Sequence, residues 1–137
     1  MSDRVVFDTE PLVAFIANEE GGDTVEGYLD CVEEGDLSGF VSPVTLTEVH
    51  YIASPLSTEK SPDDFITDLQ AAGVRRVSAS DCWRDAARYK GEHQVALGDA
   101  YSLATAAEVD GTLLVGGDDD FDEITDVDIR RFREGAA

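Results

Sequence analysis

Leu113-Leu114-Val115-Gly116-Gly117-Asp118 decides the fold, together with Val5-Val6-Phe7-Asp8 near the start of the chain. Each stretch is a short apolar run that an aspartate follows directly or after two glycines. An apolar run of this length between turn signals is typical of a strand that is buried on both faces. A carboxylate beside such a run is costly to bury unless a cation compensates its charge. The two stretches therefore predict two buried strands, each followed by an acid whose charge needs a compensating cation.

The rest of the chain alternates helix and strand signals without internal repeats. Strands are expected at residues 4–7, 39–42, 74–78, 112–115 and 128–132. Helices are expected at residues 11–17, from 23 or 24 to 34, at 43–53, at 62–72, from 80 to about 89, and at 98–109. Such alternation predicts an α/β fold with three layers: a central parallel sheet of about four to five short strands, and helices on both faces. Residues 1–137 form a single domain by this interpretation.

Four acids at wide intervals begin or end these elements: Asp8, Glu48, Asp99 and Asp118. Asp8 and Asp118 follow two strands, and binding sites in parallel sheets form beyond the carboxyl ends of the strands. Glu48 lies on the helix that starts at Pro43, and Asp99 lies in the first turn of its own helix. Taken alone, Asp99 could be a helix-start charge. Taken together, the four acids predict one site for a divalent cation.

The charge of the chain is strongly negative, with 30 acids against 10 bases and a net charge of −20. Self-repulsion of this size is screened when the Debye length falls to about 3 Å, near 1 M salt. We therefore hypothesise that the protein works in a salt-rich cytoplasm, as in a halophilic microbe. The local basic residues Arg84, Arg88 and Lys90 are candidate contacts for nucleic-acid phosphates, although pairing with neighbouring acids explains them equally well.

Other classes of site have weaker support. Cys31 and Cys82 lack the spacing of a zinc site or disulfide framework and are expected to be small buried or half-buried residues. His50 and His93 are expected at surface or packing positions rather than as general bases. The chain has no apolar run that could span a bilayer and no signal peptide, so we expect a soluble cytoplasmic protein.

The order of these motifs resembles that of the PIN-domain nucleases, and among them the VapC-type toxins of toxin–antitoxin pairs. The resemblance covers nearly the whole chain. It rests on Val5-Val6-Phe7-Asp8-Thr9, on Ser42-Pro43-Val44-Thr45-Leu46-Thr47-Glu48-Val49, on Ala96-Leu97-Gly98-Asp99-Ala100-Tyr101-Ser102-Leu103-Ala104, and on Leu113-Leu114-Val115-Gly116-Gly117-Asp118-Asp119-Asp120-Phe121.

The resemblance implies a metal-dependent endoribonuclease. Asp8, Glu48, Asp99 and Asp118 would hold Mg²⁺ or Mn²⁺ and form the catalytic centre, with Thr9 and Asp120 as auxiliary residues. It also implies an RNA substrate, a small antitoxin as partner and a homodimer. Apolar residues that could contribute to the antitoxin contact, or else to the core, are Val49, Tyr51, Ile52, Pro55 and Leu56.

Two positions depart from the family pattern. Glu10 stands where the family often has a small polar residue, and Gly116 stands where a Thr or Ser usually precedes the last acid by two positions. Loss of that hydroxyl could weaken the placement of the metal or of water, so the chain could also be a degenerate PIN module that only binds a partner.

Two other enzymes are alternatives. A ribosomal-RNA-processing nuclease of the same fold is not distinguished by the sequence. A phosphatase of the haloacid-dehalogenase type would use Asp8 as nucleophile, with Asp118 in its last motif. That family expects a second Asp at position 10 and a lysine before the last motif, and it leaves Glu48 and Asp99 without a role.

Overall fold

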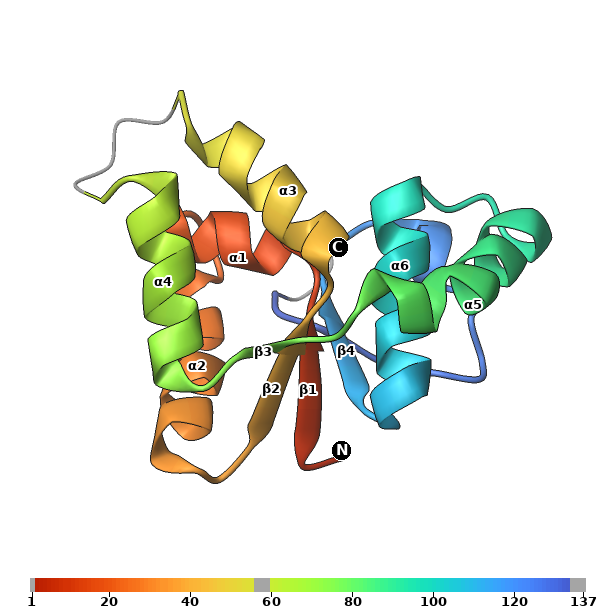
Figure 1. Ribbon diagram of the computed structural model, residues 1–137, viewed down its shortest axis with the longest axis horizontal. Helices are drawn as coiled ribbons and strands as arrows, with labels where there is room; N and C mark the ends of the chain where they lie inside the picture. Colours follow the sequence, from red (N-terminus) through yellow and green to blue (C-terminus); the bar gives the residue numbers. More distant parts are fainter. Residues whose placement is uncertain (1, 56–59, 134–137) are drawn as a thin grey trace.

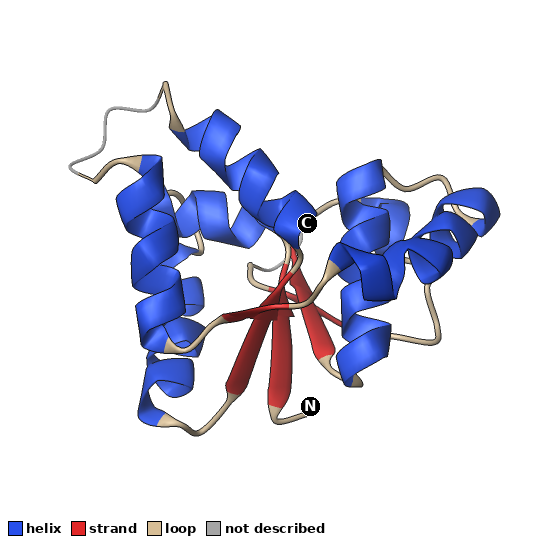
Figure 2. Ribbon diagram, in the orientation of Figure 1, coloured by secondary structure: helices blue, strands red, loops and turns tan. Residues whose placement is uncertain are grey.

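The computed structural model describes residues 2–55 and 60–133. Its elements, in chain order, are β1 (Arg4–Phe7), α1 (Thr9–Ile16), α2 (Gly22–Glu34), β2 (Ser38–Val41), α3 (Pro43–Ala53), α4 (Pro62–Ala72), β3 (Arg75–Arg76), α5 (Ala79–Glu92), α6 (Leu97–Val109), β4 (Thr112–Val115), the short 3₁₀ helix η1 (Asp119–Phe121) and β5 (Asp128–Arg131). The sheet lies between two groups of helices, with α1 to α4 on one side and α5 and α6 on the other (Figure 1; Figure 2). The expected α/β architecture is confirmed.

The five strands are all parallel and follow the order β3-β2-β1-β4-β5. The two central strands, β1 and β4, pair with Val5 opposite Thr112 and Phe7 opposite Leu114. The chain runs from β1 to one side of the sheet and later returns to the other side, which makes the space between the ends of β1 and β4 the switch point of the topology. Ligand sites in parallel sheets favour this position.

Both faces of the sheet are buried, so successive side chains of one strand enter different cores. Val5 and Phe7 pack with the helices α1, α2 and α4, whereas Val6 packs with α5 and α6. Leu114 and Leu113 divide in the same way. This explains why the central strands contain continuous apolar runs rather than alternating polar residues.

Local sequence signals set several helix starts. Ser42 caps α3 by accepting a hydrogen bond from the Val44 backbone N–H at 3.1 Å, and Pro43 takes the first helical position. Ser61 and Pro62 start α4 in the same way. Such starts matter at α3, because the first turns of this helix carry Glu48 toward the carboxyl ends of the strands.

The structure corrects some predicted bounds. The strand expected at residues 74–78 is reduced to Arg75–Arg76 at the edge of the sheet. The cap expected at Ser80 is instead Ser78, so α5 begins one residue after that serine. Helix α2 begins at Gly22 after Gly21, which adopts a positive φ of 84°, rather than at a cap on Asp23 or Thr24. No helix within the described ranges is long and apolar enough to cross a bilayer.

Candidate functional site

Asp8 lies directly beyond β1, where three elements meet. Its backbone N–H donates to the Leu114 carbonyl at 3.0 Å, so the residue continues the β1–β4 ladder. Its side chain is only 4% exposed. The Ser102 hydroxyl, on α6, donates to Asp8 Oδ1 at 2.7 Å and lies 3.3 Å from the Thr45 hydroxyl on α3. Asp8 is therefore a buried carboxylate that the Ser102 hydroxyl stabilises, and no basic side chain of the described residues pairs with it.

Glu48 reaches the same edge from α3. The Thr9 hydroxyl donates to Glu48 Oε1 at 2.9 Å. The Glu48 carboxyl group also lies against Gly98 of α6, where a Cβ would be only 2.1 Å from Oε1. Gly98 is thus the residue that lets the α3 carboxylate come close to the start of α6, next to Asp99.

Asp99 has a strongly raised pKa. Burial, then the charge of Asp8, a hydrogen bond with Asp8, and the charges of Glu48 and Asp118 together raise the pKa of Asp99 to about 8. The pKa of Asp8 is raised as well, mainly by burial, while hydrogen bonds from Ser102 and with Asp99 act in the opposite direction. Asp8, Glu48 and Asp118 therefore each lie close enough to act on Asp99, and Asp8 and Asp99 are in direct contact.

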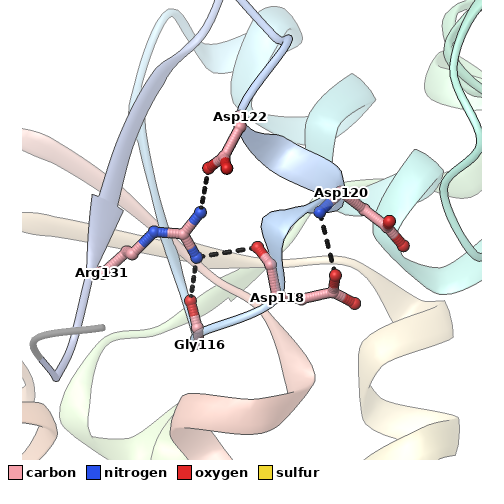
Figure 3. Close-up of polar contacts among 5 residues, drawn as sticks. All are labelled: Gly116, Asp118, Asp120, Asp122 and Arg131. Atoms are coloured by element: carbon pink, nitrogen blue, oxygen red, sulfur yellow. Dashed lines mark hydrogen bonds and ion pairs between the residues drawn. The ribbon is translucent and has the colours of Figure 1, made fainter. Parts of the chain in front are cut away.

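Asp118 lies at the exposed side of this arrangement. Its carboxylate accepts a hydrogen bond from the Asp120 backbone N–H at 2.9 Å and caps the 3₁₀ helix η1 (Figure 3). Within the described part of the chain, the one group of three or more acids, histidines or cysteines with ligand atoms all within 4.8 Å of one another is Asp118, Asp119 and Asp120. The four predicted acids are thus neighbours at one edge without forming a cluster as tight as that one.

A basic residue holds the loop that carries Asp118. Arg131, at the end of β5, donates to the Gly116 carbonyl at 2.5 Å, to the Asp118 carbonyl at 2.9 Å and to the Asp122 carboxylate at 2.7 Å (Figure 3). The guanidinium group thus joins both ends of the loop after β4. Nothing in the sequence around Arg131 indicated this structural role.

Two further residues of the site were not recognised from sequence. Ser102 stands three positions after Asp99 on a helix of small apolar residues, and this spacing places both on one side of the helix. Gly98 was counted only as part of a helix start. A serine in a buried alanine-rich helix, three positions after an acid, was the signal that could have identified Ser102.

The candidate RNA contacts lie on α5 and already have intramolecular partners. Arg88 approaches the carboxylates of Asp126 and Glu92 at 3.5 Å, and Lys90 donates to the Val95 carbonyl at 2.9 Å. The Arg84 guanidinium lies 4.5 Å from the centre of the Trp83 ring. Their role in RNA binding remains a prediction.

Other predicted residues fall in different environments. Val49 is fully buried, while Tyr51 is 61% exposed. Pro55 is exposed and Ile52 is partly exposed, and Leu56 lies outside the described residues. Both cysteines are free, with Cys82 buried and Cys31 half-buried, as expected.

The donor set fits a hard divalent cation. The groups at the edge are carboxylate and hydroxyl oxygens, which suit Mg²⁺ or Mn²⁺ better than zinc. In residues 2–55 and 60–133 we find no ion pair from Lys, Arg or His to the carboxylates of Asp8, Glu48, Asp99 or Asp118. The mutual repulsion that raises the pKa of Asp99 is what a bound cation would relieve.

Comparison with known proteins fits this geometry. Residues 5–127 match the PIN domain family. The chain belongs to the PIN domain family. No curated protein sequence shows significant similarity to the chain. As a PIN domain, the chain fits the nuclease interpretation better than the haloacid-dehalogenase alternative.

Several solved structures share the PIN fold of the chain. VapBC2 from Rickettsia felis, bound to a DNA fragment from its promoter, is similar with a TM-score of 0.70 and 13% identity, over 93% of this chain and 98% of that chain. A toxin–antitoxin complex from Klebsiella pneumoniae is similar with a TM-score of 0.68 and 20% identity, over 90% of this chain and 94% of that chain. FitAcB from Neisseria gonorrhoeae is similar with a TM-score of 0.58 and 18% identity, over 91% of this chain and 95% of that chain.

Proposed function

We propose that this PIN domain is a metal-dependent endoribonuclease that hydrolyses RNA phosphodiester bonds and serves as the toxin of a VapBC-type pair. Asp8, Glu48, Asp99 and Asp118 are its metal ligands and catalytic residues, with Thr9 and Asp120 as auxiliary residues. The observation that carries the proposal is the contact between the buried Asp8 and Asp99, with no basic side chain from the described residues paired to either.

The chain's own residues prepare this site in two ways. Ser102 and Thr9 fix the carboxylates of Asp8 and Glu48 through hydrogen bonds, so that their oxygens are oriented before any ligand binds. Burial and the charge of Asp8 favour the protonated form of Asp99, and a bound cation would displace that proton. When bound, Mg²⁺ or Mn²⁺ lowers the pKa of a water molecule and polarises the phosphoryl oxygens.

The test is cleavage of total RNA in high salt, with Mg²⁺, with Mn²⁺ or with EDTA, beside the Asp8→Asn variant. We expect cleavage by the natural chain with either cation, and none with EDTA or with the variant. Cleavage that survives both EDTA and Asp8→Asn rejects the proposal. Absence of both Mn²⁺ binding and cleavage supports the degenerate binding module instead. Fragments confined to mature ribosomal-RNA ends would favour the processing nuclease.

An apolar groove supports the antitoxin part of the proposal. A cavity of about 720 Å³ lies among α1, α2 and α4, with Phe15, Leu29 and Phe65 in its walls. Acids of α2, including Asp30 and Glu33, line the same cavity. This combination suits a basic amphipathic segment, so we assign the groove to the antitoxin.

Charge reversal tests this assignment. We expect the double variant Asp30→Lys, Glu33→Lys to lose co-purification with a co-expressed antitoxin while retaining RNA cleavage. If the antitoxin binds the double variant as tightly as the natural chain, then it binds at a surface other than this groove. The homodimer is tested separately, by light scattering of the toxin alone.

A further inference from the structure

The Glu10 side chain occupies the space that a side chain at position 116 would need. Gly116 is buried, and a Cβ at this position would lie 1.7 Å from Glu10 Oε2 and 2.0 Å from Glu10 Cδ. The glycine backbone does not adopt a positive φ, so its conformation does not demand glycine. A side chain at position 116 would therefore require the Glu10 carboxyl group to move away.

Arg133 holds that carboxyl group in place. Its Nη2 lies 2.5 Å from Glu10 Oε1, and its Nη1 donates to the Glu20 carbonyl at 3.1 Å. The guanidinium group also lies 4.6 Å from the centre of the Phe132 ring, which is buried. Because the Phe132 backbone N–H donates to the Val115 carbonyl at 3.0 Å, Arg133 is anchored to the sheet edge that carries the acids.

Glu10 faces the acidic site. It lies two residues after Asp8, in the first turn of α1, and its charge contributes to the raised pKa of Asp8. Gly116, over which it lies, is two residues before Asp118. The Glu10 carboxylate therefore stands between the two strand ends that carry Asp8 and Asp118.

We propose that Glu10 is a fifth carboxylate of the acidic site, seated over Gly116, and that Arg133 positions it there to support divalent-cation binding. The inference rests on the proposed function. An ion pair without this role could form anywhere on the surface and would not require a glycine opposite its carboxylate. Glu10 and Arg133 are positioning residues, distinct from the four acids that we propose as ligands.

Titration of the full chain with Mn²⁺ alone, followed by calorimetry, tests the role of Glu10. We expect Glu10→Gln to weaken Mn²⁺ binding about 10-fold, the size of effect seen when outer partners of metal ligands are removed. Glu34→Gln is the matched control, because it removes one exposed negative charge at the far end of α2. Equal affinities in the two variants overturn the inference.

The positioning role of Arg133 predicts a change in Mn²⁺ affinity opposite to the one that its charge alone would cause. Removing a positive charge near the site should by itself strengthen cation binding, so Arg130→Met, on the neighbouring exposed arginine, is expected to leave the affinity unchanged or slightly higher. Arg133→Met is expected to weaken Mn²⁺ binding at least threefold, because Glu10 loses its anchor, and Arg133→Lys should restore part of it. Stronger binding by Arg133→Met overturns the positioning role.

A double-mutant cycle tests the contact without any metal. Gly116→Ala should lower Tm in the natural chain, because its methyl group displaces Glu10 from Arg133, and should have little effect in a Glu10→Ala background. Equal losses in both backgrounds overturn the proposed seat of Glu10. If the natural chain binds Mn²⁺ and cleaves RNA while Glu10→Gln behaves like its control, only this inference fails. If the natural chain does neither, the proposed function fails and the inference with it.

Discussion

Two groups of carboxylates lie along the same edge of the sheet, and they are stabilised differently. Glu10 and Asp122 each pair with an arginine that follows or ends β5, Arg133 and Arg131 respectively. Asp8 and Glu48 instead accept hydrogen bonds from hydroxyl groups. The pKa of Asp99 is raised to about 8. Among residues 2–55 and 60–133, basic side chains pair with the first group and not with the second.

This difference shows where an external cation is needed. The arginine-paired acids have their charge balanced and hold segments of chain together. The acids around Asp99 keep an unbalanced charge in a partly buried place, which costs free energy unless a proton or a metal ion compensates it. Direct ligands of a cation are therefore expected where compensation is missing. Residues that position the site or hold the chain are expected where it is present.

The largest expected effect is loss of catalysis in the unbalanced group. Asp8→Asn and Asp99→Asn should each lower RNA cleavage by at least about 100-fold, because each removes a charged oxygen that we propose binds the cation. Initial rates on a short RNA with Mn²⁺, with circular dichroism as the check on folding, measure this. Asp36→Asn, in the exposed turn after α2, is the control for loss of one negative charge. Full activity in both site variants would show that the acids are structural.

The next effect concerns the balanced group and should appear in stability. Arg131→Met removes donors to the Gly116 and Asp118 carbonyls and the partner of Asp122. Hydrogen bonds from a charged donor contribute about 2 kcal/mol in total at such a partly buried position, which lowers Tm by roughly 6–10 °C. Thermal melting measures the loss, with Arg130→Met as the matched exposed arginine. A Tm equal to that of the control would mean that the loop after β4 is held by other contacts.

Much of the fold was predictable because burial leaves a direct mark on sequence. The apolar runs at β1 and β4 could only belong to strands covered on both faces, and Ser42-Pro43 and Ser61-Pro62 marked two helix starts. The strand expected at residues 74–78 was reduced to Arg75–Arg76, because a strand extends only as far as its neighbour pairs with it, and here only Phe40 and Val41 of β2 do so. No local pattern records that dependence.

The site was only partly predictable, for a related reason. Acids at the ends of strands and at the start of a helix are visible in sequence, and the topology brings them to one edge. The space that Glu10 takes over Gly116 is a contact between residues far apart in the chain, so sequence showed only two unusual residues. Their mutual fit required the structure. The same holds for Gly98, whose missing side chain admits Glu48.

A smaller effect is expected when the repulsion around Asp99 is removed without a cation. Asp99 has an ordinary pKa of 3.8 and a raised one in the folded chain, so the native state binds more protons and loses stability as the pH rises from about 4 to about 8. Asp99→Asn lacks this loss. We expect equal stability of the two proteins near pH 4, and a gain of about 1 kcal/mol for the variant at pH 9, or roughly 3–5 °C in Tm. This gain is far below the full value of the shift because the group is partly exposed.

Melting curves in EDTA at the two pH values measure the gain. Saturating Mn²⁺ should reverse it, since the natural chain gains binding energy that Asp99→Asn lacks. A variant that is less stable than the natural chain at pH 9 would show that Asp99 makes a favourable contact outweighing the repulsion.

The smallest effect separates local from overall repulsion. With a net charge of −20, the chain should gain stability in molar KCl, because a Debye length of about 3 Å screens the repulsion between exposed acids. The small gain expected for Asp36→Asn in low salt, about 0.3 kcal/mol, should vanish in 2 M KCl. The gain for Asp99→Asn should largely persist, since burial limits screening around that carboxyl group. Denaturant melts of both variants at low and high KCl compare the two. If salt removes both gains equally, the acids around Asp99 are solvated like the rest of the surface, and the contrast with the arginine-paired group loses its physical basis.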